Sequence, residues 1–347
     1  MRFLLRHKTI YRYVNPVTLK RHRLMLRPRD SHEMKLHGAS LGITPRPSHT
    51  TWQYDVFGNS VALVDFDTTT RELIVDSTLD VERFPYTDIE SLVADHARQL
   101  PLAYSAEEIR DLAGLQERHV PDPNHDIDLW AKSFLSRPNV GGNGPAETIP
   151  LLHAMAATIK NEFRYQARDA YGTQSPLETL HNRSGTCRDL AYLMMEGVRS
   201  LGLAARFVSG YIYDFSRDSA AAANRRDGHS QDTMLRGDGD LGDSRPQQNV
   251  QGPVDAPPPV VAASTAVTGG GATHAWVQIY LPGAGWTYFD PTNALTSDLE
   301  LIPVAVVRDP SQASPVSGAW EGTPGDALAI EVDVSITSRT GQQRHNE

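Results

Sequence analysis

The chain has 347 residues, of which 39% are hydrophobic, and a net charge of -9, which is typical of a globular protein with more than one folded unit. Every apolar run is shorter than the roughly 18 residues that a helix needs to cross a bilayer. Basic residues are scattered through an acidic chain, which argues against nucleic acid as the main partner. We therefore expect neither a membrane nor a nucleic acid as a partner.

Cysteine usage narrows the chemistry and the expected location. Cys187 is the only cysteine, which excludes an internal disulfide and a zinc site built from several thiolates. The first residues, MRFLLRHKTIYRY, are interrupted by charges, so we expect no signal peptide. The sequence predicts a cytoplasmic protein that needs no metal and no cofactor.

Residues 1–84 predict a β-rich N-terminal domain. Its segments are short, rich in β-branched and aromatic residues, and separated by turn signals such as Asn15-Pro16 and Gly58-Asn59. The predicted strands are FLLRHKTIYRY, TLKRHRLMLRP, HTTWQYDVF, SVALVDFD and ELIVDSTLDVERF.

Residues 85–145 predict a helical connection, and residues 146–300 a catalytic core. Apolar residues recur at helical spacing in SAEEIRDLAGLQERH, DIDLWAKSFLSR, AETIPLLHAMAATIKNEF and SPLETLHNR. Strands follow in AARFVSGYIYD, THAWVQIYL and GWTYFDPTN, and the tail at 301–347 predicts a β C-terminal extension with LIPVAVVRD and ALAIEVDVSIT.

Residues 214–272 interrupt this core with a different composition. The segment is rich in Asp, Gly, Ala, Pro and Ser and holds one aromatic residue, Phe215. Such a segment buries too little apolar surface to offset the entropy lost on ordering. We expect a flexible insertion, with a substrate-selecting lid as the alternative.

Cys187 lies at the start of a predicted amphipathic helix. Thr186 suits the N-cap position, and Asp189 completes a capping box three residues later. Cys187 is then the first helical residue, where free N–H groups and the helix dipole favour a thiolate and can hold an oxyanion. The alternative is a small buried apolar residue, as most free cysteines are. The apolar stripe of this helix comprises Leu190, Leu193, Met194, Val198 and Leu201.

His274 and Asp290 fall on two adjacent predicted strands. Strand alternation places His274 opposite the aliphatic face of its strand. A hairpin with His274 facing Asp290 would bring their Cβ atoms to roughly 4.5–5.5 Å, so the carboxylate would fix the imidazole tautomer. The alternative is a surface histidine beside an Asp-Pro turn. This register also pairs Trp276 with Tyr288 and Gln278 with Trp286.

With these residues the sequence resembles the bacterial transglutaminase-like superfamily of cysteine peptidases. The resemblance rests on RSGTCRDLAYLMMEGVRSLGLAARFVSGYIYD and THAWVQIYLPGAGWTYFDPTN, and it extends to YRYVNPVTLKRHRLMLRPR and YDVFGN near the N-terminus and to VAVVRDPSQASPVSGAWEG near the C-terminus. It implies a catalytic triad of Cys187, His274 and Asp290. It also implies an α+β fold, with a papain-like core whose cysteine-bearing helix packs on an antiparallel sheet.

We therefore expect a thiol-dependent acyl-transfer enzyme that acts on a peptide or protein substrate through a thioester. Hydrolysis would make it a peptidase or amidase, and transfer to an amine would make it a transglutaminase. A binding protein that kept the fold without turnover is the alternative from another class. Tyr165 and Trp276 are predicted walls of the acyl site, although each could belong to the core. The sequence predicts neither the substrate nor the oligomeric state.

Overall fold

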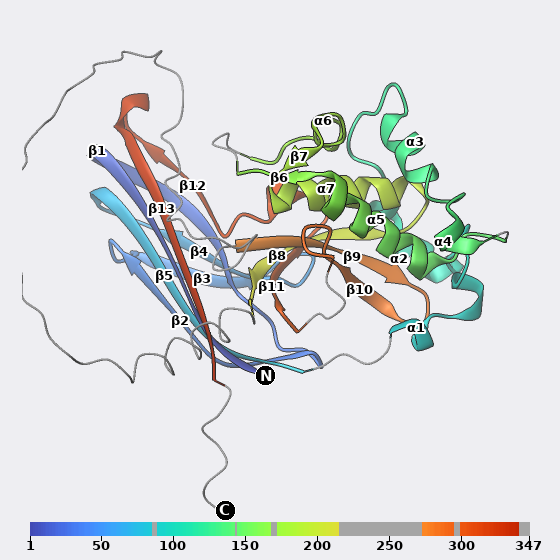
Figure 1. Ribbon diagram of the computed structural model, residues 1–347. Helices are drawn as coiled ribbons and strands as arrows, with labels where there is room; N and C mark the ends of the chain where they lie inside the picture. The colour runs from blue at the N-terminus through green and yellow to red at the C-terminus, as the bar shows by residue number, and fades with distance from the viewer. Residues whose placement is uncertain (85–88, 143, 168–171, 215–272, 295–298, 340–347) are drawn as a thin grey trace, which may run out of the picture.

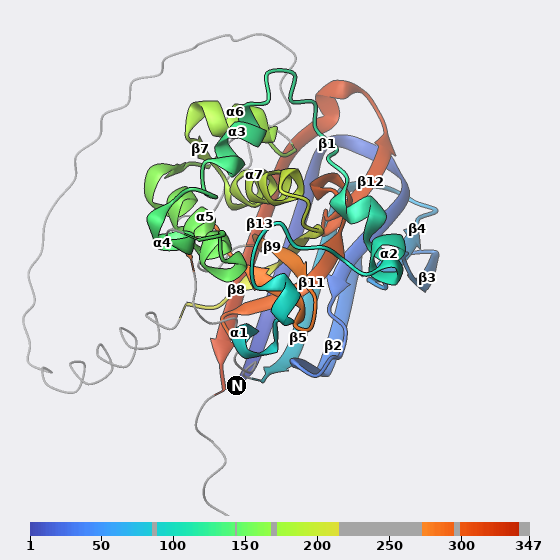
Figure 2. The same cartoon turned by 90° about the vertical axis from the view of Figure 1, so that its right-hand side faces the viewer.

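The computed structural model describes residues 1–84, 89–142, 144–167, 172–214, 273–294 and 299–339. A seven-stranded sheet, a four-stranded sheet and a group of helices follow one another across the molecule (Figure 1). Seen from the side, the helices and the four-stranded sheet lie in front of the seven-stranded sheet (Figure 2). The predicted α+β class, with a β-rich N-terminal region, is confirmed.

The seven-stranded sheet contains every predicted N-terminal strand. Its central path runs β2-β5-β1-β4-β3, and β12 and β13 also pair with β1. The side chains of β5 alternate between buried and partly exposed, as expected for a sheet with one face in a core. The strands are β1 (Arg2–Arg27), β2 (Met34–Thr44), β3 (His49–Tyr54), β4 (Ser60–Asp65), β5 (Thr69–Arg83), β12 (Val316–Glu321) and β13 (Ala327–Ser338).

Strand β1 corrects the prediction of two strands separated at Asn15-Pro16. It is continuous, but its pairing with β5 is interrupted between Arg12 and Val17. Pro16 falls in this interruption, where its missing N–H breaks no ladder hydrogen bond. Asn15 donates from Nδ2 to Asp326 Oδ1 at 2.8 Å, so the apparent turn is a bulge tied to the C-terminal region.

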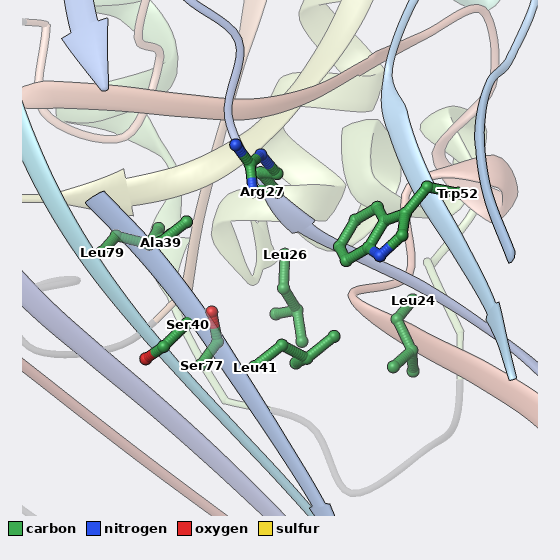
Figure 3. Close-up of a pocket in the computed structure, with 9 residues that line it drawn as sticks. All are labelled: Leu24, Leu26, Arg27, Ala39, Ser40, Leu41, Trp52, Ser77 and Leu79. Carbon is green, nitrogen blue, oxygen red and sulfur yellow. The ribbon is translucent and has the colours of Figure 1, made fainter. Parts of the chain in front are cut away.

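An apolar pocket with roughly 350 Å³ of empty space, part of it open to solvent, lies in this sheet domain. Leucines of β1 and β5 line it, and Trp52 of β3 stands across from Ala39 of β2 (Figure 3). Strands β2 and β3 are the two ends of the sheet path, so the pocket lies between its edges.

The helices fall within the predicted helical segments and between them. Three of them, α2, α6 and α7, begin with a capping box, which satisfies free N–H groups at the helix start. The α-helices are α1 (Ile89–Leu92), α2 (Ala106–Gln116), α3 (Asp126–Lys132), α4 (Pro138–Gly141), α5 (Thr148–Glu162), α6 (Pro176–Asn182) and α7 (Cys187–Ser200). Short 3-10 helices lie at η1 (Asp95–Ala97), η2 (Pro310–Gln312) and η3 (Pro324–Asp326).

The four-stranded antiparallel sheet has the order β10-β9-β8-β11. Its aliphatic face, which includes Val277 and Ile279, packs with Leu190 and Met194 of α7 in the largest hydrophobic core. The predicted packing of the cysteine-bearing helix on an antiparallel sheet is thus confirmed. The strands are β8 (Ala205–Ile212), β9 (Thr273–Leu281), β10 (Gly285–Phe289) and β11 (Leu301–Val307). A separate parallel pair comprises β6 (Arg164–Tyr165) and β7 (Ser184–Gly185).

The segment predicted as a C-terminal extension divides between the two sheets. Strand β11 pairs with β8 in the four-stranded sheet, whereas β12 and β13 pair with β1. The predicted insertion at 214–272 lies outside the described residues apart from Asp214. The four domain boundaries stay predictions.

A buried histidine joins the two sheets. His7 of β1 contacts the hydroxyl of Tyr211 on β8 through Nδ1 at 2.7 Å, and Thr9 Oγ1 through Nε2 at 3.0 Å. Burial lowers the pKa of His7 to about 4, although Asp333 and Asp76 act in the opposite direction. The imidazole is therefore neutral at pH 7.

Candidate active site

Cys187 is the first residue of α7, and Thr186 is its N-cap, as the sequence predicts. The Thr186 hydroxyl accepts from the N–H of Asp189, whose carboxylate accepts from the N–H of Thr186 at 2.8 Å. The carboxylate also accepts from the N–H of Gln174 at 2.6 Å. This buried capping box fixes the start of the helix, and the Cys187 side chain lies there only 6% exposed.

Gly185 makes room for this capping box. A Cβ atom at position 185 would lie 2.7 Å from Cβ of Asp189, closer than van der Waals contact allows. The chain can therefore bring the Asp189 carboxylate onto the N–H of Thr186 only because residue 185 has no side chain.

His274 and Asp290 form a buried ion pair beside the start of α7. His274 Nε2 lies 2.8 Å from Asp290 Oδ2, and neither side chain is exposed. Because the carboxylate is an acceptor, Nε2 carries the proton in this tautomer. The predicted contact between the imidazole and the carboxylate is present.

The hairpin that produces this contact has a different register from the predicted one. Tyr280 pairs with Trp286 and Gln278 with Tyr288, a shift of two residues. The turn sets the register: Ala284 N–H donates to Leu281 O at 3.0 Å, and Gly283 and Gly285 adopt positive φ. A shift of two residues preserves the strand face, so the imidazole and carboxylate still meet, diagonally rather than directly opposite.

Burial and charge act against each other in this pair. Burial opposes the charged imidazolium, but Asp290 and the sulfur of Cys187 outweigh it and raise the pKa of His274 to about 10. Burial likewise opposes the carboxylate, yet His274, Asn293 and the N–H of Thr292 lower the pKa of Asp290. The raised pKa of His274 and the lowered pKa of Asp290 both favour an imidazolium–carboxylate pair.

The second ring nitrogen of His274, Nδ1, is not used by Asp290. Nδ1 is buried and has no hydrogen-bond partner among the described residues, and Cys187 contributes to the raised pKa of the ring. Since Nε2 is taken by Asp290, Nδ1 is the nitrogen left for the thiol proton. The structure thus brings together all three residues predicted for the triad.

Tyr165 lies beside the same sulfur. Strand β6 pairs in parallel with β7, so Tyr165 aligns with Gly185, two residues before Cys187. Burial, followed by the electrostatic influence of Cys187, raises the pKa of Tyr165. The phenol therefore stays protonated as a donor, and its side chain is 40% exposed. Tyr165 stays a predicted wall of the acyl site.

Trp276 lies behind the histidine and not in an accessible wall. Its side chain is fully buried, and its ring stacks on His274 with centroids 5.9 Å apart and planes inclined by 27°. Contrary to the prediction, Trp276 therefore does not offer its ring to a substrate. It supports the imidazole of His274 instead.

Asn293 is a functional candidate that the sequence reasoning missed. Its Nδ2 donates to Asp290 Oδ2 at 2.8 Å and lies 3.4 Å from His274 Nε2. The sequence feature that could have revealed Asn293 is its position three residues after Asp290 in DPTN. At this spacing Asp and Asn side chains often form local hydrogen bonds.

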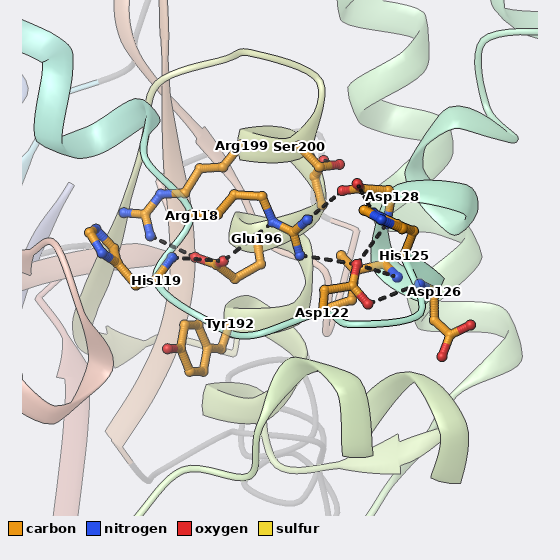
Figure 4. Close-up of polar contacts among 12 residues, drawn as sticks. Arg118, His119, Asp122, His125, Asp126, Asp128, Tyr192, Glu196, Arg199 and Ser200 are labelled. Carbon is orange, nitrogen blue, oxygen red and sulfur yellow. Dashed lines mark hydrogen bonds and ion pairs between the residues drawn. The ribbon is translucent and has the colours of Figure 1, made fainter.

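A buried charged cluster holds the opposite end of α7. Arg199 Nη1 donates to Glu196 Oε1 at 2.8 Å, and neither side chain is exposed. Glu196 also accepts from the N–H of His119 at 3.2 Å, and Arg118 bridges to Asp122 at 3.2 Å (Figure 4). The loop before α3 is thereby fastened to the helix that carries Cys187.

The residues that the structure describes include no group of three or more His, Cys, Asp or Glu side chains placed to hold a metal ion. Within the same residues, no helix is both long and apolar enough to span a bilayer.

Comparisons with known proteins agree with this arrangement. An uncharacterised protein of Mycobacterium tuberculosis H37Rv is 26% identical over 357 residues, covering 99% of this chain and 95% of the relative. One from Mycobacterium leprae is 23% identical over 342 residues, covering 95% and 96%. The crystal structure of a "putative cysteine protease" from Cytophaga hutchinsonii has a TM-score of 0.61 at 15% identity, covering 99% of this chain and 92% of that one, and shows the same fold.

Two family descriptions match successive parts of the chain. Residues 3–82 match the bacterial transglutaminase-like N-terminal region. Residues 140–291, which include Cys187, His274 and Asp290, match the transglutaminase-like superfamily. Residues 3–82 thus match the bacterial transglutaminase-like N-terminal region, and residues 140–291 match a transglutaminase-like core.

Proposed function

We propose that the protein is a cysteine hydrolase that cleaves peptide, isopeptide or other carboxamide bonds through a thioester on Cys187. The match to the superfamily supports a thiol-dependent enzyme in general. One observation carries the finer proposal: the buried His274–Asp290 pair, at 2.8 Å, leaves Nδ1 of the imidazole for the thiol at the start of α7.

Acylation begins when Cys187 Sγ attacks the carbonyl carbon. His274 Nδ1 holds the thiol proton in the imidazolium form, the S–C bond forms, and the carbonyl π electrons move to the oxygen. Collapse of this intermediate breaks the C–N bond, and His274 gives the proton to the leaving nitrogen. Asp290 holds the imidazole in the required tautomer and stabilises its charged form.

The oxyanion needs donors near the sulfur. Free N–H groups at the N-terminus of α7 are one source. The hydroxyl of Tyr165 is the other, because it lies near enough to Cys187 for the two groups to interact and its raised pKa keeps the proton in place. Tyr165 therefore serves as a donor to the developing negative charge.

Deacylation uses the same histidine in reverse. Water attacks the thioester, its proton passes to His274, and the C–S bond breaks to release an acid and the thiol. An amine in place of water would give a transglutaminase product. We propose water because no described feature selects an amine.

The test exploits the single cysteine of the chain. A peptide, isopeptide and amide library is incubated with the wild type, with and without added primary amine, and acyl-enzyme formation is followed by mass spectrometry. We expect a thioester adduct on Cys187 that water resolves, and no adduct in Cys187→Ala. A binding protein on this fold would form no adduct, and an amine-dependent product would identify a transglutaminase.

His274→Ala is the matched control for chemistry. We expect iodoacetamide to label Cys187 faster than a model thiol in the wild type and no faster in the variant. Equal labelling of the wild type and the model thiol would contradict an activated nucleophile.

A further inference from the structure

The carboxylate of Asp290 receives hydrogen bonds on both oxygens. Oδ1 accepts from the N–H groups of Thr292 at 2.9 Å and Asn293 at 3.3 Å. Oδ2 accepts from His274 Nε2 and from Asn293 Nδ2, both at 2.8 Å. Two side chains therefore share the oxygen that faces the imidazole.

Asn293 is itself held in place by two neighbours. Lys160 on α5 donates from Nζ to the main-chain oxygen of Asn293 at 2.6 Å. The N–H of Ala294 donates to the main-chain oxygen of Asp290 at 2.8 Å, and Ala294 adopts a positive φ of 48°. This closed turn brings the Asn293 amide back onto the carboxylate.

We propose that Asn293 is a positioning residue that keeps Asp290 oriented toward His274 and ionised, and so maintains the reactivity of Cys187. The inference rests on the proposed function, because it assigns a role within the same triad. The amide hydrogen-bonds to the carboxylate that orients the imidazole, so Asn293 acts through Asp290.

The physical reason is the burial of the carboxylate. A buried carboxylate with few donors is costly and takes up a proton more readily. Without the amide, the oxygen facing the imidazole would keep His274 as its sole side-chain donor among the described residues. A protonated Asp290 no longer stabilises the imidazolium, so Cys187 would lose reactivity at a higher pH than in the wild type.

The experiment measures the alkylation rate of Cys187 by iodoacetamide across pH. Because the chain has one cysteine, every alkylation event reports on this site without knowledge of the substrate. Asn293→Ala should move the acid limb to higher pH and slow the rate there by about 10- to 100-fold, the range set by a hydrogen bond to a charged group.

Asn59→Ala is a matched control. Asn59 Nδ2 also donates to an aspartate, Asp55 Oδ2, at 2.9 Å, and its other side-chain bonds go to Val306. Its removal deletes the same type of contact away from the site, so it should lower thermal stability and leave the alkylation profile unchanged.

A double-mutant cycle separates positioning from general packing. In an Asp290→Asn background, Asn293→Ala should change the alkylation rate by no more than about twofold, because the anion it serves is gone. If Asp290→Asn does not fold, the proton resonance of His274 Nε2–H in Asn293→Ala gives a second readout, which should shift from its wild-type position.

The outcomes are distinguishable. A wild-type rate no faster than a model thiol at any pH overturns the proposed function and this inference with it. A fast wild type with an unchanged Asn293→Ala profile overturns the role of Asn293 alone. The same loss in both Asp290 backgrounds also overturns it, since a packing defect does not depend on the carboxylate.

Discussion

His274 lies directly opposite Gly210 across β9 and β8, and the absence of a side chain at position 210 leaves the space that Trp276 occupies. A Cβ atom there would lie 2.1 Å from Ile302 O and 2.8 Å from the Trp276 ring. The stacking of Trp276 on His274 therefore depends on this glycine.

Gly210→Ala should lower the free energy of unfolding by about 1–3 kcal/mol through overpacking. It should also reduce turnover, because Trp276 must move away from the imidazole. Gly114→Ala on α2 has nothing within 4 Å of its new Cβ and should stabilise by roughly 0.5–1 kcal/mol. Denaturant titrations of both variants check this contrast, and a fully stable Gly210→Ala would contradict the packing account.

Cys187→Ala should abolish turnover and leave the fold intact, because a first-turn helix position tolerates alanine. His274→Ala should cost nearly as much, about 10⁶-fold, since members of a triad act as a unit. The loss in Asp290→Asn should be roughly a hundredfold smaller. Steady-state kinetics and thermal melts test these expectations. Normal turnover by Cys187→Ala would exclude the mechanism.

Tyr165→Phe should lower kcat by about 10²-fold with little change in KM, because the hydroxyl acts mainly on the developing oxyanion. The ring remains, so packing at the site should be preserved. A loss confined to KM would instead indicate that the hydroxyl binds the ground state of the substrate.

Glu196→Ala should destabilise the protein by about 3–5 kcal/mol, because it leaves the buried Arg199 guanidinium without its carboxylate. Glu196→Gln keeps an acceptor for the N–H of His119 and should cost less. Denaturation midpoints give the order of the two variants. A Glu196→Gln variant as stable as the wild type would show that the charge contributes nothing.

His7 should make stability depend on acidity. Its folded-state pKa of about 4 lies below the unfolded value of about 6.5. The unfolded chain therefore binds a proton first as pH falls, and stability present above pH 6.5 is lost between 6.5 and 4. The loss should approach roughly 3 kcal/mol. His7→Gln should show a shallower decline in thermal midpoint over this interval, and an identical decline would exclude His7 as a source.

Features that depend on neighbouring residues were predictable from the sequence. The capping box of Thr186 and Asp189 is a four-residue pattern, so it located the start of α7 and hence Cys187. Strand alternation likewise placed His274 and Asp290 on one face. Both rules depend only on residues a few positions apart, so they can be applied to the sequence alone.

Features that depend on a turn or a distant strand were not predictable. The register of β9 and β10 depends on positive φ at Gly283 and Gly285, and the contact of Asn293 depends on the turn after β10. The continuity of β1 past Pro16 depends on partners far along the chain. Trp276 alternates onto the histidine face, but its burial depends on side chains from other strands, such as Val208 and Leu301.

The pairing of β1 with β13 joins Phe3 to Ser338 and Tyr13 to Ala327. During synthesis, β1 leaves the ribosome long before β13, so this ladder forms only after residues 327–338 have been made. Such distant pairing slows folding. Until those residues arrive, one edge of β1 remains open to pairing with other nascent chains, so β1 depends on a segment made much later for the protection of that edge.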